Sequence, residues 1–250
     1  MSEKKFCALI LAAGKGTRMK SEKAKVLHVL NGKPLLHYSL VAAKEAGAEK
    51  IVAVIGHQAE VVRKEFAGSG CVFVEQNPQL GTGHAVLQAK DVLSGYDGLT
   101  VILCGDVPLL KSSTVKSLID NHVTSKAVVS VLTTIPPPPH AYGRIVKDDK
   151  GNVLKIIEHR DATEDEKKIG EINTGIYCVD TKFLFHALGK VTNNNQQGEY
   201  YLTDIVEIAV REGQKVKSFI ASDYVEVMGI NTLEELARAE KHLLKQTENL

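Results

Sequence analysis

The stretch from Phe6 to Lys25, FCALILAAGKGTRMKSEKAK, constrains the fold more than any other part of the chain. Its apolar first part, Phe6 to Ala13, predicts a central parallel strand that is covered on both faces. A glycine-rich loop with several cations, Gly14 to Arg18, follows at once. Backbone amides in such a loop can approach a phosphate, and Lys25 adds a further charge. The spacing matches neither a Walker loop nor, because residue 19 is Met, the dinucleotide fingerprint. The stretch therefore predicts a different kind of phosphate loop.

Strand-like and helix-like patterns alternate through residues 6–135. Further strands are expected at 50–56, 71–76, 99–106 and 127–135, and helices at 34–46, 57–67, 84–93 and 112–122. This alternation predicts an α/β fold with a Rossmann-like, doubly wound and mainly parallel sheet. Right-handed crossovers would place the carboxyl ends of its strands at one edge. That edge would then collect the phosphate loop, the polar stretch 76–82 and Asp106.

The pattern changes after the prolines at 136–139. A hairpin is expected from 142–147 and 153–159, strands at 171–180, 215–221 and 224–228, and helices at 182–191, 202–212 and 233–246. We expect one domain, 1–250, in which an antiparallel-rich lobe (140–231) packs on a parallel lobe (1–135) and leaves a cleft between them. Residues 232–250 form the terminal segment.

Composition excludes several classes of partner. The 250 residues include 31 basic and 30 acidic side chains, a net charge of +1, which leaves no electrostatic footprint for nucleic acid or an anionic membrane. No apolar run approaches the ~18 residues that a membrane span needs. The start, MSEKK, does not read as a secretory segment, and the four cysteines lie far apart. We therefore expect a soluble cytoplasmic protein.

A series of motifs falls in one order along the chain. They are LAAGKGTRM (11–19) with Lys25, EQNPQLGTGHA (75–85), LCGDVPL (103–109), AYGRIV (141–146), IIEHRDAT (156–163), EINTGIY (171–177), NNNQQGEYYLTDI (193–205) and GIN (229–231). Together they closely resemble the uridyltransferase domain of the bacterial bifunctional enzyme that makes UDP-N-acetylglucosamine, across residues 6–240. The resemblance implies a nucleotide-diphospho-sugar transferase fold. It also implies transfer of a uridylyl group from UTP to N-acetylglucosamine 1-phosphate, assisted by Mg²⁺.

The resemblance also implies which residues act. Arg18 and Lys25 would be catalytic, and Asp106 and Asn231 would bind the metal. The residues expected at the nucleotide are Leu11, Ala13, Gly14, Gly16, Gln76, Gly81 and Thr82. Those expected at the sugar are Gly143, Glu158, Asn173, Tyr201 and Thr203. This set suits a reaction between two anions, which requires charge neutralisation and in-line positioning more than a covalent nucleophile.

Alternatives remain open on the sequence alone. The acceptor could be another hexose 1-phosphate such as glucose 1-phosphate, or the chain could be a non-catalytic nucleotide-sugar-binding protein. Asp106 could simply cap a helix. Ala24 and Cys104 stand where this family usually has Pro and often Tyr. The chain stops about where the family's left-handed β-helix acetyltransferase domain would begin, so acetyl transfer is not expected. A homo-oligomer is compatible with the sequence.

Overall fold

The computed structural model describes residues 5–248. The first four residues, for which no secretory segment was expected, lie outside the described residues. So do the last two residues of the predicted terminal segment 232–250.

β1 (Phe6–Ala12) is an interior strand of the main sheet and pairs in parallel with β4 (Lys50–Ile55) on one side and β6 (Leu99–Cys104) on the other. Residues 7–10 are completely buried. Alternate side chains enter two different cores, Ala8 and Ile10 on one face and Cys7 and Leu9 on the other. This is the strand that the uninterrupted apolar run predicted, covered on both faces.

Seven strands form the main path of one twisted sheet, in the order β11-β7-β10-β6-β1-β4-β5, and the β8–β9 hairpin extends from β10. The remaining strands are β5 (Val72–Glu75), β7 (Val129–Thr134), β8 (Arg144–Lys147), β9 (Val153–Ile157), β10 (Ile172–Asp180) and β11 (Val216–Ile220). A separate small hairpin consists of β2 (Val29–Leu30) and β3 (Lys33–Pro34). The fold is the predicted mainly parallel α/β arrangement with added antiparallel strands.

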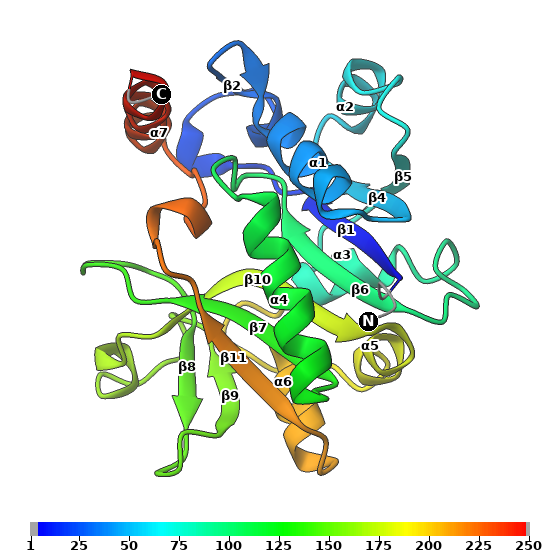
Figure 1. The fold of residues 1–250 in the computed structure, drawn as a ribbon, viewed down its shortest axis with the longest axis vertical. Helices are drawn as coiled ribbons and strands as arrows, with labels where there is room; N and C mark the ends of the chain where they lie inside the picture. The colour runs from blue at the N-terminus through cyan, green and yellow to red at the C-terminus, as the bar shows by residue number, and fades with distance from the viewer. Residues whose placement is uncertain (1–4, 249–250) are drawn as a thin grey trace.

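Helices cover both faces of the sheet (Figure 1). One core lies under α1 (Leu35–Ala46), α2 (Ala59–Glu65) and α4 (Ser112–Ser125). The other lies under α3 (Thr82–Leu87), α5 (Thr181–Leu188) and α6 (Asp204–Arg211). The last helix, α7 (Leu233–Glu248), packs beside the β2–β3 hairpin. None of these described helices has the length and apolar character that crossing a membrane requires.

The sheet continues across the boundary expected near residue 140. β10 lies between β6 and β7 and runs antiparallel to both, and β11 then pairs in parallel with β7. The two predicted lobes are therefore not two separate sheets. β10 can take this interior place because all nine of its residues are buried or half-buried and its apolar side chains enter both cores.

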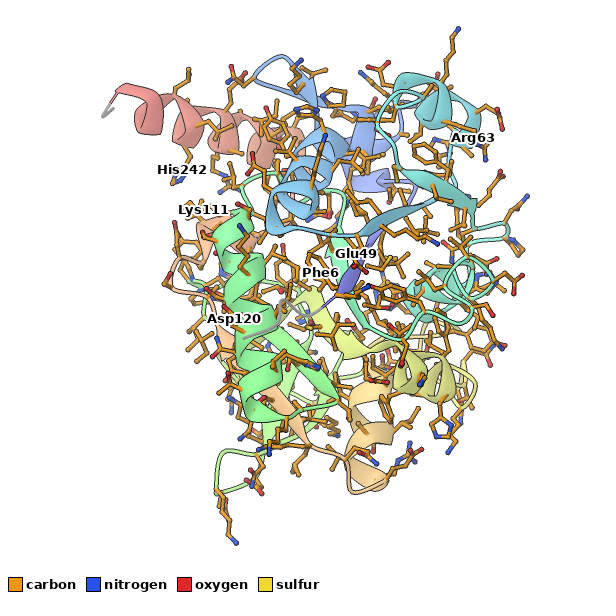
Figure 2. The ribbon with its side chains drawn as sticks, turned by 45° about the vertical axis from the view of Figure 1, so that its right-hand side comes forward. Phe6, Glu49, Arg63, Lys111, Asp120 and His242 are labelled. Carbon is orange, nitrogen blue, oxygen red and sulfur yellow. The ribbon has the colours of Figure 1, made fainter. Side chains whose placement is uncertain are left out.

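One predicted strand is wrong. Residues 224–228 contain a short 3₁₀ helix, Val225–Val227, instead of a strand. Its buried Glu226 accepts a hydrogen bond from the backbone amide of Lys111, at the start of α4, and this contact fixes the turn against that helix. Figure 2 shows Lys111 at the start of that helix. The contact fixes the chain just before residues 229–231, which reach the candidate site.

The strand order also locates the site. The chain builds β4 and β5 on one side of β1 and then returns to place β6 on the other side. In open α/β sheets, ligands bind beyond the carboxyl ends of the strands at such a switch point. The phosphate loop leaves β1 and the Gly105–Asp106 turn leaves β6 at this position. Among the described residues, none of the four cysteines forms a disulfide.

Candidate active site

The loop after β1 is shaped around Lys25. Gly16 has φ +64°, and a Cβ built on it would lie 2.6 Å from the Cβ of Lys25, so only glycine allows this close approach. A 3₁₀ helix, Thr17–Met19, follows, and the buried Met19 anchors it to the protein. Arg18, between these fixed points, stays exposed. The loop thus holds one cation at the surface and one against the sheet.

Four side chains from distant parts of the sequence meet here; we call them the charged cluster: Arg18, Lys25, Asp106 and Asn231. Lys25 forms an ion pair with Asp106 and donates to Asn231 Oδ1 over 3.0 Å. Arg18 Nη2 donates to the same oxygen over 2.8 Å, across 213 residues of sequence. The sequence placed these residues in separate motifs, and the structure brings all four together.

Asn231 is held by contacts that the sequence analysis missed. Its backbone amide donates to Glu235 Oε2 over 2.6 Å, and the neighbouring amide of Ile230 donates to the carbonyl of Asp106 over 2.8 Å. Glu235 and Thr232 also exchange hydrogen bonds at the start of α7. Their T-x-x-E spacing is a capping-box signature, so the sequence did contain the signal for Glu235.

Several of the residues expected at the nucleotide form hydrogen bonds near the ends of β1 and β5. Gln76, only 4% exposed, donates from Nε2 to the carbonyl of Gly81 over 2.9 Å. The carbonyl of Leu11 accepts from Gly105, and that of Ala13 accepts from Gln79 over 2.9 Å. A cavity of about 450 Å³ adjoins them, lined by Lys15, Gly56, His57, Gln58, Glu75, Gln76, Asn77, Pro78 and Gln79. Lys15, His57 and Gln79 were not among the predicted site residues.

Gly14 and Thr82, both expected at the nucleotide, differ in how closely the protein surrounds them. A Cβ on Gly14 would meet nothing within 4 Å, so this exposed position is open. Thr82 uses its hydroxyl to accept from the amide of Leu202 over 3.0 Å. Gly81 and Gly83 pack against the backbone of Tyr200, where side chains would clash. The Gly81–Gly83 turn is therefore fastened to the segment that precedes α6.

A second group, the Glu158 cluster, consists of Gly143, Glu158, Asn173 and Thr203. The backbone amide of Asn173 donates to the carbonyl of Gly143 over 2.9 Å. A Cβ on Gly143 would lie 3.5 Å from Glu158 Oε2. Thr203 donates to Glu158 Oε1 over 3.3 Å. Four of the five residues expected at the sugar thus lie together, where β8, β9 and β10 meet the start of α6.

Tyr201, the fifth, forms hydrogen bonds with residues outside this cluster. Its hydroxyl donates to Asp161 over 3.1 Å and accepts from Gln197 over 2.7 Å. Asp161 also accepts from the amide of Gln196 over 2.9 Å. Tyr201 therefore closes the 193–199 loop against the protein and adjoins a cavity of about 320 Å³ that Glu158 also lines.

Burial changes the acidity of this region. It raises the pKa of Glu158, with Asp161, Asp204 and Glu199 adding to the rise and the Thr203 hydrogen bond opposing it. It also raises the pKa of Asp204 to about 6, with further contributions from Glu207 and Asp161. Several carboxylates thus share a partly desolvated space, which disfavours their charged forms.

Tyr142, which the prediction did not assign a role, lies close to the charged cluster. Burial raises its pKa to about 12, and the charges of Asp106 and Glu235 add to the effect while Arg18 opposes it. Its neighbour Gly143 belongs to the Glu158 cluster, so this short segment adjoins both groups. Only its position beside Gly143 in the AYGRIV motif pointed to it.

The comparisons with known proteins agree with this geometry. A family profile described as nucleotidyl transferase matches residues 7–245. The chain belongs to the nucleotidyl transferase family. The bifunctional protein GlmU of Geotalea daltonii is 49% identical over 236 residues, 94% of this chain and 52% of that protein. The GlmU protein of Desulfotalea psychrophila is 47% identical over 241 residues, 96% of this chain and 71% of that protein. The chain spans about half the length of most of these curated relatives.

A solved structure, UDP-glucose pyrophosphorylase complexed with UDP-glucose, shares the fold. Its TM-score is 0.75 at 20% identity, over 97% of this chain and 99% of that one. The predicted resemblance is thus confirmed: this nucleotidyl transferase matches the first part of the bifunctional proteins and has the fold of a nucleotide-sugar pyrophosphorylase.

Nucleotidyl transferases of this family generally use a divalent metal, and the charged cluster has suitable ligands for one. The ammonium of Lys25 contacts both Asp106 Oδ2 and Asn231 Oδ1, so these oxygens already converge on one cation. Carboxylate and amide oxygens are ligands that Mg²⁺ accepts, usually with few others from the protein. Within residues 5–248, no group of three or more His, Cys, Asp or Glu side chains offers another metal site.

Proposed function

We propose that this nucleotidyl transferase joins UTP and N-acetylglucosamine 1-phosphate, giving UDP-N-acetylglucosamine and diphosphate. A phosphate oxygen of the sugar phosphate attacks the α-phosphorus of UTP and forms a new P–O bond. The bond from that phosphorus to the bridging oxygen of the β-phosphate breaks, and diphosphate leaves. No proton has to move and no covalent enzyme intermediate is needed.

The convergence of Arg18, Lys25, Asp106 and Asn231 carries this proposal. UTP and a sugar phosphate repel each other, and charge accumulates on the leaving diphosphate as the bond breaks. Lys25 and Arg18 lie at the switch point of the sheet, where they can neutralise this charge at the triphosphate. Their present oxygen partners in the protein keep them positioned before the substrate arrives.

Mg²⁺ held by Asp106 and Asn231 would supply further Lewis-acid stabilisation of phosphate oxygens. Asp106 and Asn231 would hold such an ion, and Lys25, which now contacts both residues, would then be available to a phosphate. The proximity of Lys25 to both oxygens makes this change of partner a short movement of a flexible side chain. The arrangement thus supports a site in which oxygens of the protein and of the substrate phosphates compete for Arg18 and Lys25.

The two sides of the charged cluster suit the two substrates. Gln76, adjoining the larger cavity, offers an amide to a pyrimidine base. The Glu158 cluster offers a carboxylate and the Asn173 amide, which suit the hydroxyl and N-acetyl groups of a hexosamine. Thr82, fastened to Leu202, connects the two sides. The identity of nearly half the residues with GlmU proteins supports the same pair of substrates.

The direct test is diphosphate release. Purified protein is mixed with UTP, N-acetylglucosamine 1-phosphate and Mg²⁺, and release is followed with and without chelator. We expect release that depends on all three components. No release above the blank would reject the proposal, and binding of UTP without turnover would favour a binding protein.

A panel of sugar phosphates then tests the acceptor. Glucose 1-phosphate, galactose 1-phosphate and N-acetylgalactosamine 1-phosphate are compared at equal concentration. We expect the highest kcat/KM with N-acetylglucosamine 1-phosphate. A clear preference for a hexose without the N-acetyl group would keep uridylyl transfer and change the product.

A further inference from the structure

The side-chain amide of Gln76 has a defined orientation. Its nitrogen, Nε2, donates to the carbonyl of Gly81 over 2.9 Å and lies 3.1 Å from Nδ1 of His84. In the described part of the chain no group donates to its oxygen, Oε1. Gln76 is almost fully buried and lines the cavity beside the phosphate loop. The nitrogen is thus committed to the protein, and the oxygen remains for a ligand.

The direction of this amide decides which base it can pair with. Amide oxygen accepts and amide nitrogen donates, and a half-turn of the group exchanges them without changing its shape. Uracil presents an N–H at position 3, whereas cytosine presents an unprotonated nitrogen acceptor there. An exposed Oε1 therefore pairs with uracil and repels cytosine. The reverse orientation would favour cytosine.

His84 restrains this choice together with Gly81. The carbonyl of Gly81 needs a donor, which keeps Nε2 of Gln76 on its side. A neutral imidazole carries a single N–H, so Nδ1 of His84 must be the acceptor and Nε2 must carry the proton. His84 lies in α3, and the half-buried amide of Gln88, one turn later, lies 3.2 Å from that Nε2. Gln88 Nε2 also donates to the carbonyl of His84 over 2.9 Å, so a half-turn of the Gln88 amide would exchange that bond for one accepted from the Nε2 proton of the ring.

We propose that His84 is a positioning residue for base selection: its Nδ1 holds the Gln76 amide so that Oε1 faces the base and selects uracil over cytosine. This inference rests on the proposed uridylyl transfer. His84 touches neither phosphate nor sugar in this scheme. Its effect reaches the base only through Gln76.

Two polar substitutions separate this role from simple packing. In His84→Asn, the side-chain oxygen falls near the position of Nδ1 and can still accept from Gln76. In His84→Gln, the polar group extends towards the position of Nε2, and the contact with Gln76 is lost. His84→Leu removes both contacts and retains apolar bulk.

The readout is the ratio of kcat/KM for UTP to kcat/KM for CTP at saturating sugar phosphate. We expect the parent and His84→Asn to share a high ratio. Losing one of the two hydrogen bonds that hold the amide should lower the ratio roughly fivefold in His84→Gln and His84→Leu. Equal ratios in all four proteins, with changes only in melting temperature or kcat, would overturn the proposal. If the Leu variant does not fold, the Asn and Gln pair still decides.

Calorimetric binding of UTP and CTP without sugar phosphate separates this inference from the proposed function. If the parent releases no diphosphate, the proposed function fails, yet the binding ratios of the variants still test His84. If the parent releases diphosphate from UTP and CTP equally well, the reaction class stands and the base-selection proposal is overturned.

Discussion

The charged cluster and the Glu158 cluster prepare for ligands in opposite ways. In the charged cluster, cations and oxygens of the protein contact one another directly, with Lys25 bridging Asp106 and Asn231. In the Glu158 cluster, the carboxylate has one long hydrogen bond from Thr203. Burial raises its pKa, and the charges of Asp161, Asp204 and Glu199 add to the rise. The cations of the first cluster are paired with protein oxygens before a ligand arrives, whereas the Glu158 carboxylate accepts from Thr203 alone among the described residues.

This difference indicates what each cluster recognises. Exchanging a protein oxygen for a phosphate oxygen keeps every cation paired, so the charged cluster can follow a shift of charge during the reaction. A carboxylate with few hydrogen-bond donors in the protein gains most from neutral donors such as sugar hydroxyls. Damage to the charged cluster should therefore reduce kcat, and damage to the Glu158 cluster should raise the KM for the sugar phosphate.

The largest effect is expected from Arg18→Ala. Removing a preorganised charge partner of the leaving diphosphate should lower kcat roughly 100- to 1,000-fold, with the sugar-phosphate KM little changed. Diphosphate release measures both quantities. Lys23→Ala, which removes an exposed cation a few residues away, is the control and should keep normal kinetics. Equal losses of kcat in both variants would mean that only the overall positive charge of the loop matters, and not the position of Arg18.

Glu158→Gln tests the other cluster. The change keeps shape but removes the charge that accepts from sugar hydroxyls, so the sugar-phosphate KM should rise roughly tenfold while the UTP KM stays the same. The melting temperature should not fall, because a neutral amide is easier to bury. Glu164→Gln, at an exposed acid between β9 and β10, is the control. An effect confined to kcat would contradict the division between the clusters.

Gly16→Ala tests whether the close approach of the loop to Lys25 is needed for activity. An added Cβ would meet the Lys25 Cβ at 2.6 Å, and alanine at φ +64° costs ~1–2 kcal/mol. We expect kcat to fall several-fold together with the melting temperature. Gly14→Ala, where a Cβ would meet nothing within 4 Å, is the matched control. If both alanine variants behaved like the parent, the close approach would have no role in placing Lys25.

The phosphate side could be predicted because its signals are local. An apolar strand, two glycines and nearby cations lie within twenty residues, and the parallel topology brings Asp106 to the same edge. The Glu235 contact was also readable, since T-x-x-E is a local pattern. By contrast, the position of β10 between β6 and β7 depends on pairing among strands far apart in sequence. No periodicity in β10 itself specifies its neighbours.

Some residues escaped prediction because their roles depend on tertiary contacts. His84 was read as the start of a helix, and only the structure places its ring against Gln76. The segment 224–228 has strand-like composition, yet the buried contact of Glu226 with α4 favours a 3₁₀ turn. In each case the side-chain partner, rather than local propensity, decides the outcome.

The smallest effect concerns the acidity of the region around the Glu158 cluster and is measured as stability. Burial raises the pKa of Asp204 to about 6 from an ordinary value of 3.8, so the folded protein binds this proton more tightly than the unfolded chain. Ionisation therefore disfavours the folded state above about pH 6, and this penalty is relieved as the pH falls from about 6 to about 4. The amide introduced by Asp204→Asn cannot titrate, so only the parent should lose stability through this group as the pH rises from 4.5 to 6.5. The melting temperature of the parent minus that of the variant should therefore decrease by a few °C over this range. Above that range it should stay constant.

Asp97→Asn supplies the control for this titration. The exposed Asp97 pairs with Lys182, whose hydrogen bond and charge lower its pKa below the ordinary value. Its stabilising contribution is present above that ordinary value and is lost only as the pH falls through the lowered pKa, so its melting-temperature difference should be flat from pH 4.5 to 8. A flat profile for Asp204→Asn as well would show that the acidic residues beside Glu158 are fully solvated. The contrast between the paired cations of the charged cluster and the Glu158 carboxylate would then rest on hydrogen bonding alone.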